Sequence, residues 1–297
     1  MARPAARMRP GTNRDGLRPL LACPVCKGGL EFLPGLIRCV ACELGFPQSR
    51  DDCIDLFPDH LWAPEASRWE ARQRETERAY RELIGDPAHA VRAYRNDYDP
   101  LAFLLAGYGG RVVDIGGGNG IVRHYLPPEA EYIVVDPSLD WLEPAWASIS
   151  EAFPRLVEEL SFVRGVGEYL PFRDETFDHA LSIWSLNHVG QPEPTMREAW
   201  RVLRPRGTFL LVLDDVPPRW RDLVDGGFPM RDGREAARVI GRRLWAVIGG
   251  WPLQPDHLRI SEADLRRWAS PGFETIQRRW IGAYLTLELR KTGLHAR

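Results

Sequence analysis

The chain has 297 residues, of which 44% are hydrophobic and 27% charged, the balance of an ordinary globular protein. A formal net charge of −2 provides no global basic field of the kind that favours nucleic acid as a partner. The longest apolar run, 101–108, is less than half the length of a membrane-spanning helix, so no membrane span is predicted.

The N-terminal segment 1–19 is rich in arginine and contains a single acidic residue, Asp15. An arginine-rich, acid-poor terminus is typical of a transit peptide, but such peptides are also amphipathic and rich in serine. This segment has no serine and no apolar face. We therefore predict a disordered tail.

Residues 20–58 contain two C-x-x-C pairs, Cys23 with Cys26 and Cys39 with Cys42, separated by twelve residues. Two intervening residues let both thiolates of a pair point into one tetrahedral site, and four thiolates close the coordination sphere of a structural zinc ion. A short segment with little apolar sequence needs such a metal to fold. We therefore predict a zinc ribbon; two disulfides or an iron–sulfur centre are the alternatives.

The clustering of the cysteines also bears on the cellular compartment. Outside the cluster the chain has a single cysteine, Cys53, whereas a secreted protein spreads paired cysteines through its fold. We therefore predict a cytoplasmic protein and interpret Cys53 as a small buried hydrophobic residue of the ribbon.

Residues 59–110 have a composition typical of helices, and we predict a helical cap or linker there. From 111 onward strand-like and helix-like segments alternate, which is the signature of a parallel sheet covered by helices. The predicted strands are 111–115, 132–135, 161–164, 177–184, 207–213, 273–280 and 283–289, and the predicted helices 120–126, 139–156, 193–203 and 261–268. The predicted fold is α/β, with a doubly wound, seven-stranded Rossmann-like sheet over 111–297, a lid insertion at 217–257 and a small N-terminal zinc ribbon.

A glycine-rich loop follows the first predicted strand. Asp114, Gly116, Gly118 and Gly120 stand in a strand–loop–helix context. A dinucleotide-binding loop has the spacing G-x-G-x-x-G, and its third glycine position is occupied here by Ile121. The carboxylate of Asp114 would repel a pyrophosphate and suits a ligand with an ammonium group. Spacing and charge therefore disfavour a dinucleotide.

A second carboxylate, Asp136, ends the next predicted strand, eighteen residues after Gly118. In a doubly wound sheet the carboxyl ends of neighbouring strands meet, so we expect Asp136 beside the loop and within reach of ribose hydroxyls. The loop and the carboxylate together fit one ligand that carries both an ammonium group and a ribose.

These residues carry a resemblance to a known family. The spacing Asp114-x-Gly116-x-Gly118-x-Gly120 is similar to the first motif of class I S-adenosylmethionine-dependent methyltransferases with a type 11-like domain, and 134–138 resembles their second motif. Further similar segments are 167–172, 175–180, 198–207 and 261–274. The resemblance implies S-adenosylmethionine as cofactor and implies the cofactor-binding residues Asp114, Gly116, Gly118, Gly120, Asp136, Pro137, Glu168 and Trp184.

One departure from the family pattern concerns adenine. Family members commonly carry an aspartate that bonds the adenine amine where this chain has Val166. We therefore expect adenine to be held by backbone groups and neighbouring side chains, with Glu168 as one contact.

The run 23–58 resembles the zinc ribbon of the small activator subunit of tRNA and translation-factor methyltransferases. The resemblance covers fewer than forty residues, and this chain has Asp52-Cys53-Ile54-Asp55 where those proteins usually have Asp-Gly-Ile-Pro. It implies a ribbon that contacts a partner domain or RNA.

Methyl transfer from a sulfonium needs alignment of nucleophile, carbon and sulfur, and it needs a general base only where the acceptor must lose a proton. His188 follows the strand 177–184 at the position that faces the acceptor in the resembling enzymes, so it is the candidate base. A structural histidine that bonds backbone is the alternative. Tyr94 and Tyr98 are expected to line the cofactor site.

The sequence leaves three functions open. The first, favoured by the near-neutral charge and an aromatic-rich lid, is methylation of a small molecule. The second is methylation of ribosomal or transfer RNA, with the zinc ribbon in contact with the RNA. The third is a non-enzymatic scaffold whose ribbon binds a partner and whose cofactor site is vestigial, and the intact acidic and glycine positions argue against it.

Overall fold

The computed structural model describes residues 14–49, 53–58, 85–138, 146–157, 161–219 and 257–293, with a few residues between these ranges (74–75, 78, 82–83, 222, 237–238, 240–241 and 244). Most of the predicted lid at 217–257, most of 59–84 in the predicted cap, and 1–13 of the predicted tail lie outside the described residues. None of the helices among the described residues reaches the length and apolarity that crossing a membrane requires.

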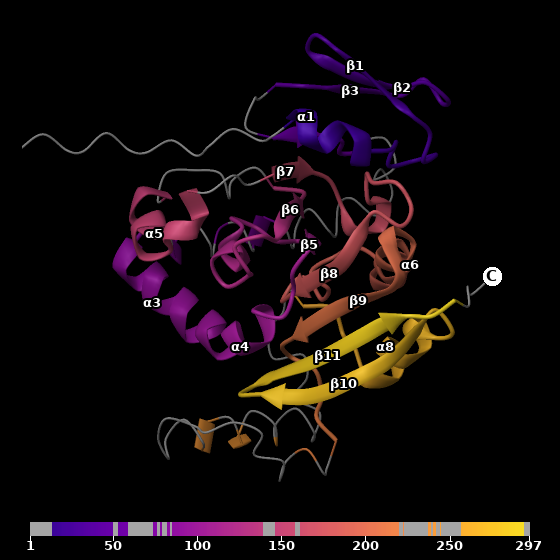
Figure 1. The fold of residues 1–297 in the computed structure, drawn as a ribbon. Coiled ribbons are helices and arrows are strands. Elements are labelled where there is room, and N and C mark those ends of the chain that lie inside the picture. The colour runs from indigo at the N-terminus through magenta and orange to yellow at the C-terminus, as the bar shows by residue number, and fades with distance from the viewer. Residues whose placement is uncertain are drawn as a thin grey trace, which may run out of the picture.

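One sheet of eight strands forms the centre of the protein, in the order β10-β11-β9-β8-β5-β6-β7-β4 (Figure 1). Its strands are β4 (Ile54–Asp55), β5 (Arg111–Ile115), β6 (Glu131–Asp136), β7 (Ser161–Arg164), β8 (Phe177–Ile183), β9 (Leu203–Leu213), β10 (Phe273–Ile281) and β11 (Tyr284–Lys291). Neighbours from β9 to β4 pair in parallel, whereas β11 pairs antiparallel with both β9 and β10. The predicted doubly wound α/β sheet of seven strands is confirmed, and the two-residue β4 adds an eighth strand from the cysteine-rich segment.

Helices cover both faces of this sheet because successive residues of a strand point to opposite faces. On β5, Val113 and Ile115 belong to one buried cluster and Val112 to another. The first cluster continues into α6 (Pro192–Val202) and α8 (Glu262–Ala269), and the second into α3 (Pro87–Tyr98) and α5 (Trp146–Ala152) (Figure 1). Short helical turns are α1 (Arg14–Leu17), η1 (Arg18–Leu20), η3 (Asp99–Leu101), α4 (Ala102–Leu105), η4 (Ile121–His124), η6 (Pro154–Val157) and η7 (Gly167–Tyr169).

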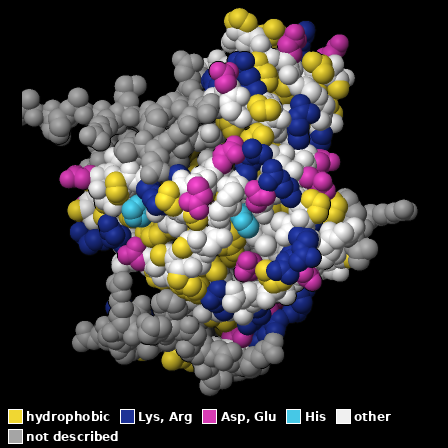
Figure 2. Space-filling view, in the orientation of Figure 1, with side chains coloured by type: hydrophobic (Ala, Val, Ile, Leu, Met, Phe, Trp, Pro, Cys, Tyr) yellow, Lys and Arg dark blue, Asp and Glu magenta, His cyan; other side chains and the backbone are white. Residues whose placement is uncertain are grey.

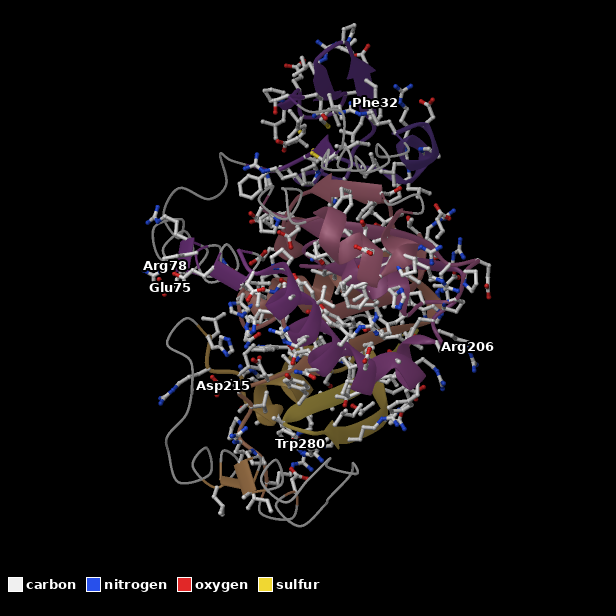
Figure 3. The ribbon with its side chains drawn as sticks, turned by 90° about the vertical axis from the view of Figure 1, so that its left-hand side faces the viewer. Phe32, Glu75, Arg78, Arg206, Asp215 and Trp280 are labelled. Atoms are coloured by element: carbon white, nitrogen blue, oxygen red, sulfur yellow. The ribbon has the colours of Figure 1, made fainter. Side chains whose placement is uncertain are left out.

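The cysteine-rich segment forms a small antiparallel sheet of β1 (Leu30–Leu33), β2 (Leu36–Cys39) and β3 (Gly45–Pro47). Figure 3 shows Phe32 of this sheet and Trp280 of β10 at opposite ends of the molecule. The segment is joined to the central sheet, since β4 pairs with β7 and Leu21 forms a bridge with Phe172. Ile37 of β2 also lies in the buried cluster that continues into α6. The ribbon therefore shares a hydrophobic core with the sheet.

Two local predictions differ from the structure in kind, and others differ in bounds, as where the strand predicted at 207–213 begins at Leu203. The tail predicted as disordered over 1–19 is helical from Arg14 onward, and Leu17 is only 1% exposed, because its side chain joins the shared core. The helix predicted at 120–126 is only the 3-10 turn η4, since Gly120 before it has a left-handed φ of 79° and Pro127 follows.

Candidate functional site

A cavity of about 430 Å³ opens at the carboxyl ends of β5, β6 and β8. In open α/β sheets this is where ligands bind, in the crevice outside the strand ends. The loops after the strands contribute its walls at 116–119, 135–137, 165–168 and 183–185. Helix α3 and the start of β11 close it from the side.

The glycine loop approaches its neighbours closely. The backbone N–H of Gly116 donates to the carbonyl of Val135 at 2.7 Å, which ties the loop to β6. Gly116 has a left-handed φ of 72°, and a Cβ placed there would lie 2.5 Å from the Cβ of Ser185. Both the left-handed φ and the close contact with Ser185 exclude a side chain at position 116. No side chain of residue 116 therefore covers the backbone of the loop, and a ligand in the cavity can approach it.

Asp136 ends β6 and is only 8% exposed. Its Oδ2 accepts a hydrogen bond from the backbone N–H of Gly118 at 3.0 Å, and its Oδ1 accepts one from the N–H of Ser138 at 2.9 Å. These two bonds orient the carboxylate on the cavity wall beside the glycine loop. A carboxylate oxygen can accept more than one hydrogen bond, so this group has the chemistry that hydroxyl groups of a ligand require.

Asp114 lies beneath the loop, 1% exposed, and does not line the cavity. Its Oδ2 accepts a hydrogen bond from Tyr132 Oη at 2.5 Å, and its Oδ1 has no partner among the described residues. Burial raises the pKa of the Asp114 carboxyl to about 6, although the Tyr132 hydroxyl opposes the rise. A Cβ on Gly117 would lie 2.8 Å from this carboxylate, so Asp114 supports the loop from below.

The segment 165–168 forms the wall of the cavity on the β7 side. Val166 is 3% exposed and gives this wall an apolar surface. Glu168 is 7% exposed, and its Oε1 accepts a hydrogen bond from the backbone N–H of Gln191 at 2.8 Å. Glu168 therefore lines the cavity and is held there through its bond to the backbone of Gln191.

At the other end of the cavity, Trp184 follows directly after β8 with a left-handed φ of 51°. Its ring lies 4.8 Å from that of Tyr98 on α3 and 4.9 Å from that of Tyr284 on β11. A non-glycine residue in this region of φ costs of order 1–3 kcal/mol and is found most often at functional sites. The strained backbone places the indole between two tyrosines.

Two further carboxylates line this end. Asp97 on α3 accepts a hydrogen bond from Tyr284 Oη at 2.9 Å, and Asp214 after β9 accepts one from Asn187 Nδ2 at 2.9 Å. Burial raises the pKa of Asp97, and the nearby charge of Asp214 raises it further. Burial likewise raises the pKa of Asp214, although His257 and Asn187 oppose the rise.

His188 lines the cavity beside a second histidine. Its ring meets that of His257 edge to face, with centroids 4.6 Å apart. Nδ1 of His257 lies 3.2 Å from a carboxylate oxygen of Asp215, a residue labelled in Figure 3. The backbone N–H of His188 donates to Ser185 at 2.9 Å, which holds the turn that presents the ring.

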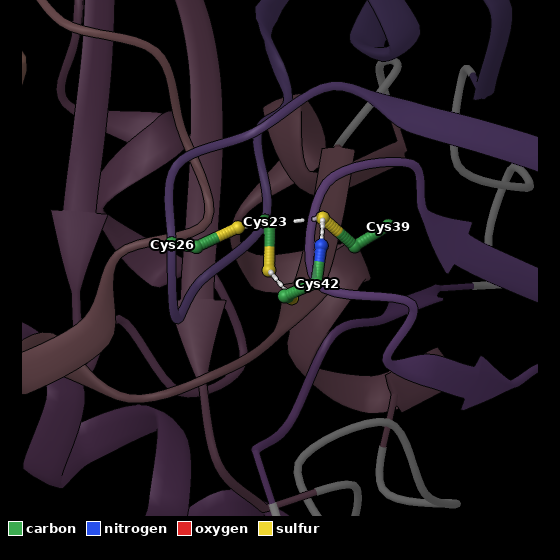
Figure 4. Close-up of side chains that lie close together, drawn as sticks. All are labelled: Cys23, Cys26, Cys39 and Cys42. Atoms are coloured by element: carbon green, nitrogen blue, oxygen red, sulfur yellow. Dashed lines mark hydrogen bonds between the residues drawn. The ribbon is translucent and has the colours of Figure 1, made fainter.

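The four predicted metal ligands converge at the ribbon (Figure 4), and their sulfur atoms all lie within 4.8 Å of one another. Sγ of Cys26 is 3.4 Å from Sγ of Cys39, and Sγ of Cys23 is 3.7 Å from Sγ of Cys42. A disulfide needs a separation of about 2.05 Å, whereas four sulfurs about 2.3 Å from a zinc ion lie about 3.8 Å apart. Backbone N–H groups also point at the sulfurs, as from Gly28 to Cys26 at 3.4 Å. The geometry fits a tetrahedral zinc ion.

The cavity brings together most of the residues singled out from the sequence. Those that line it are Gly116, Gly118, Asp136, Pro137, Glu168, Trp184 and His188, together with Tyr94 and Tyr98. Asp114 lies below the loop, and Gly120 ends the loop outside the lining. Sequence reasoning missed Asp97 and Tyr284 at the cavity. Asp214 directly follows the predicted strand 207–213, and its place at the carboxyl end of a strand is the signal that could have indicated a role here.

Residues 113–211 match the family described as a methyltransferase domain. A protein of Bacillus subtilis described as uncharacterized methyltransferase YcgJ is 36% identical over 164 residues, which are 54% of this chain and 61% of that protein. A 2-methyl-6-phytyl-1,4-hydroquinone methyltransferase of Oryza sativa is 30% identical over 140 residues, which are 46% of this chain and 40% of that protein. The chain thus spans less than two thirds of the length of these two curated relatives.

Among solved structures, the crystal structure of YcgJ from Bacillus subtilis superimposes with a TM-score of 0.45 and 20% identity. The superposition covers 66% of this chain and 99% of that one.

Proposed function

We propose that the protein is a class I S-adenosylmethionine-dependent methyltransferase that holds its cofactor in the cavity after β5. The stretch that matches a methyltransferase domain, 113–211, includes the glycine loop, Asp136, Glu168 and Trp184. The observation that supports the proposal most is Asp136, a buried carboxylate on the cavity wall that is bonded to the loop at Gly118.

The residues around the cavity fit the groups of S-adenosylmethionine. The Asp136 carboxylate suits the ribose hydroxyls, and the apolar wall at Val166 suits the adenine ring. The open backbone at Gly116 lets the methionine part approach β5 closely. The buried Asp114 Oδ1, without a partner among the described residues, adds negative charge beneath a ligand that is a cation at its sulfur.

When bound, the cofactor supplies a methyl group on a positively charged sulfur. The chain's part is to align the acceptor with that carbon and to exclude water. Tyr98, Trp184 and Tyr284 form an aromatic end wall that does both. His188 is the proposed base for an acceptor that must lose a proton, and its ring is positioned by packing on His257.

A small-molecule acceptor is favoured over RNA. On the face drawn in Figure 2, Lys and Arg side chains are interspersed with Asp and Glu, whereas a phosphate backbone is bound by clustered basic residues. The curated relative from Oryza sativa is named as acting on a hydroquinone, which is a small molecule.

We further propose that Cys23, Cys26, Cys39 and Cys42 hold a structural zinc ion. The convergence of four sulfurs within one small volume supports this. The zinc would stabilise the fold of the ribbon and take no part in methyl transfer, because four protein thiolates leave no open coordination position. The cytoplasmic location and the contact of the ribbon with RNA or a partner stay predictions.

Calorimetric titration with S-adenosylmethionine tests the cofactor proposal. We expect Asp136→Ala to weaken binding by about 10- to 100-fold, since a charge-assisted hydrogen bond is worth roughly 1.5–3 kcal/mol. Glu131→Gln is the matched control, because Glu131 begins the same strand and lies at its far end, where it pairs with Arg111. Unchanged affinity in Asp136→Ala contradicts the assignment of Asp136 to the ribose, and no binding by the unmodified protein refutes the proposal and revives the non-enzymatic scaffold.

A further inference from the structure

The strand order separates the two ends of the cavity. Asp136 ends β6, whereas Asp214 follows β9 and Tyr284 begins β11. Strands β5 and β8 lie between β6 and β9 in the sheet, so Asp214 and Tyr284 stand across the glycine loop from Asp136. Asp97 joins them through its hydrogen bond with Tyr284. With the ribose at Asp136, as proposed above, the acceptor must enter at this other end.

The acceptor end combines negative charge with aromatic rings. Asp97 and Asp214 both line it, and the rings of Tyr98 and Tyr284 both pack against that of Trp184 there. Asp214 is 17% exposed in its side chain, so little solvent screens it. No lysine or arginine is among the described lining residues, and the basic side chain beside Asp214 is His257, whose Nδ1 lies 3.9 Å from its Oδ1.

We propose that this end selects a small acceptor whose nucleophile is a basic nitrogen, an amine that enters as its ammonium form. An ammonium group is attracted both by carboxylates and by the faces of aromatic rings. This inference rests on the proposed function, because it assumes that the donor occupies the Asp136 end.

For such an acceptor, the residues that line the cavity can account for every proton and electron pair that moves during methyl transfer. The ammonium first gives one proton to His188, the base proposed above, which frees the nitrogen lone pair and leaves both carboxylates ionised. The lone pair then forms the new N–C bond as the C–S bond breaks and its electrons stay on sulfur. The positive charge thus moves from sulfur to nitrogen, toward the two aspartates, and the carboxylates stabilise the charge that develops there.

A phenolic or carboxylate acceptor fits this end poorly. Its reacting form is an anion, which would lie beside Asp97 and Asp214 and be repelled by both. The relative from Oryza sativa is named for a hydroquinone substrate. We therefore expect the acceptor of this chain to differ in charge from that substrate.

Three aromatic probes of similar size and different charge test the inference: 2-phenylethylamine, 2-phenylethanol and phenylacetate, each titrated into the protein saturated with S-adenosylhomocysteine. We expect the amine to bind at least about tenfold more tightly than the alcohol, and the carboxylate most weakly. Asp97→Asn and Asp214→Asn should each weaken amine binding about tenfold and leave alcohol binding within about threefold. Asp99→Asn is the matched control, because Asp99 also accepts a tyrosine hydroxyl, from Tyr125, but does not line the cavity.

The design separates the two proposals. Failure of the unmodified protein to bind S-adenosylhomocysteine refutes the proposed function. Binding of S-adenosylhomocysteine with an amine affinity no better than that of the alcohol, including no measurable binding of any probe, overturns only the inference about the acceptor. The order of the three probe affinities in the unmodified protein tests the inference about the acceptor even if an aspartate variant fails to fold.

Discussion

The cysteine ribbon and the glycine loop are both built around short motifs, but they differ in how many contacts they make with neighbouring strands. The strands of the ribbon sheet bury only two large apolar side chains, Ile37 and Phe46, around four converging sulfurs. The glycine loop instead is bonded to β6 at Val135, packs on Ser185 after β8, and rests on the buried Asp114. The ribbon motif therefore concentrates its own contacts at four sulfurs while Ile37 and Phe46 join the core shared with the sheet, and the glycine loop depends on three neighbouring strands.

The largest effect is expected from a change of one metal ligand. Cys26→Ser should reduce zinc from about one ion per chain to near zero, and the amides of 21–49 should lose protection from hydrogen exchange. The physical reason is that zinc binding supplies about 10–16 kcal/mol in small zinc-dependent folds, far more than two buried side chains provide. Cys26 is exposed, so packing losses do not obscure the result.

Cys53→Ser is the control for the metal experiment. Cys53 is 2% exposed and lies in the other buried cluster, outside the group of four sulfurs, so its replacement should leave the zinc content unchanged. Full zinc occupancy in Cys26→Ser would contradict the role of Cys26 as a ligand, and no zinc in the unmodified protein would show that the ribbon holds by packing without a metal.

Two glycines with the same backbone angle sharpen the comparison. Gly116 in the loop has φ of 72° and Gly35 in the ribbon hairpin has φ of 71°. A Cβ added at Gly35 would have no neighbouring atom within 4 Å. A Cβ added at Gly116 would lie 2.5 Å from the Cβ of Ser185. We expect Gly35→Ala to cost about 1–2 kcal/mol from backbone strain alone, and Gly116→Ala about 2–5 kcal/mol from strain plus crowding. Urea unfolding measures both, and equal losses would mean that the loop does not depend on its neighbours.

A smaller effect is expected where the ribbon meets the sheet. Nζ of Lys27 lies 2.6 Å from Glu198 on α6 and also donates to the carbonyl of Leu170. Lys27→Met should destabilise the protein by about 1–2 kcal/mol, because the pair is mostly shielded from solvent. Arg38→Met breaks an exposed pair with Glu31 inside the ribbon and should cost about 0.5 kcal/mol or less. Thermal unfolding compares the two, and the reverse order would contradict a ribbon docked on the sheet.

The sequence was most informative where chemistry depends on short spacing. The four cysteines, Gly116 and Gly118, and Asp136 at the end of a strand could be predicted, because C-x-x-C, G-x-G and the alternation of strands and helices are local patterns. Asp114 was predicted as a cofactor contact, but it lies beneath the loop, and whether it acts on the cofactor from there stays a prediction.

Other features depend on contacts that no local pattern encodes. Asp97 and Tyr284 are 187 residues apart and meet only through the packing of α3 on β11. The pairing of β4 with β7 likewise could not be predicted, since two residues are too few to show a strand period.

The most direct test of the central claim is a crystal structure with S-adenosylhomocysteine. We predict that the ribose hydroxyls bond to Asp136, that adenine lies against Val166, and that the sulfur points toward Trp184 and Tyr98. A ligand bound with its ribose at Asp97 and Asp214, or bound outside the cavity, would contradict the assignment of donor and acceptor ends.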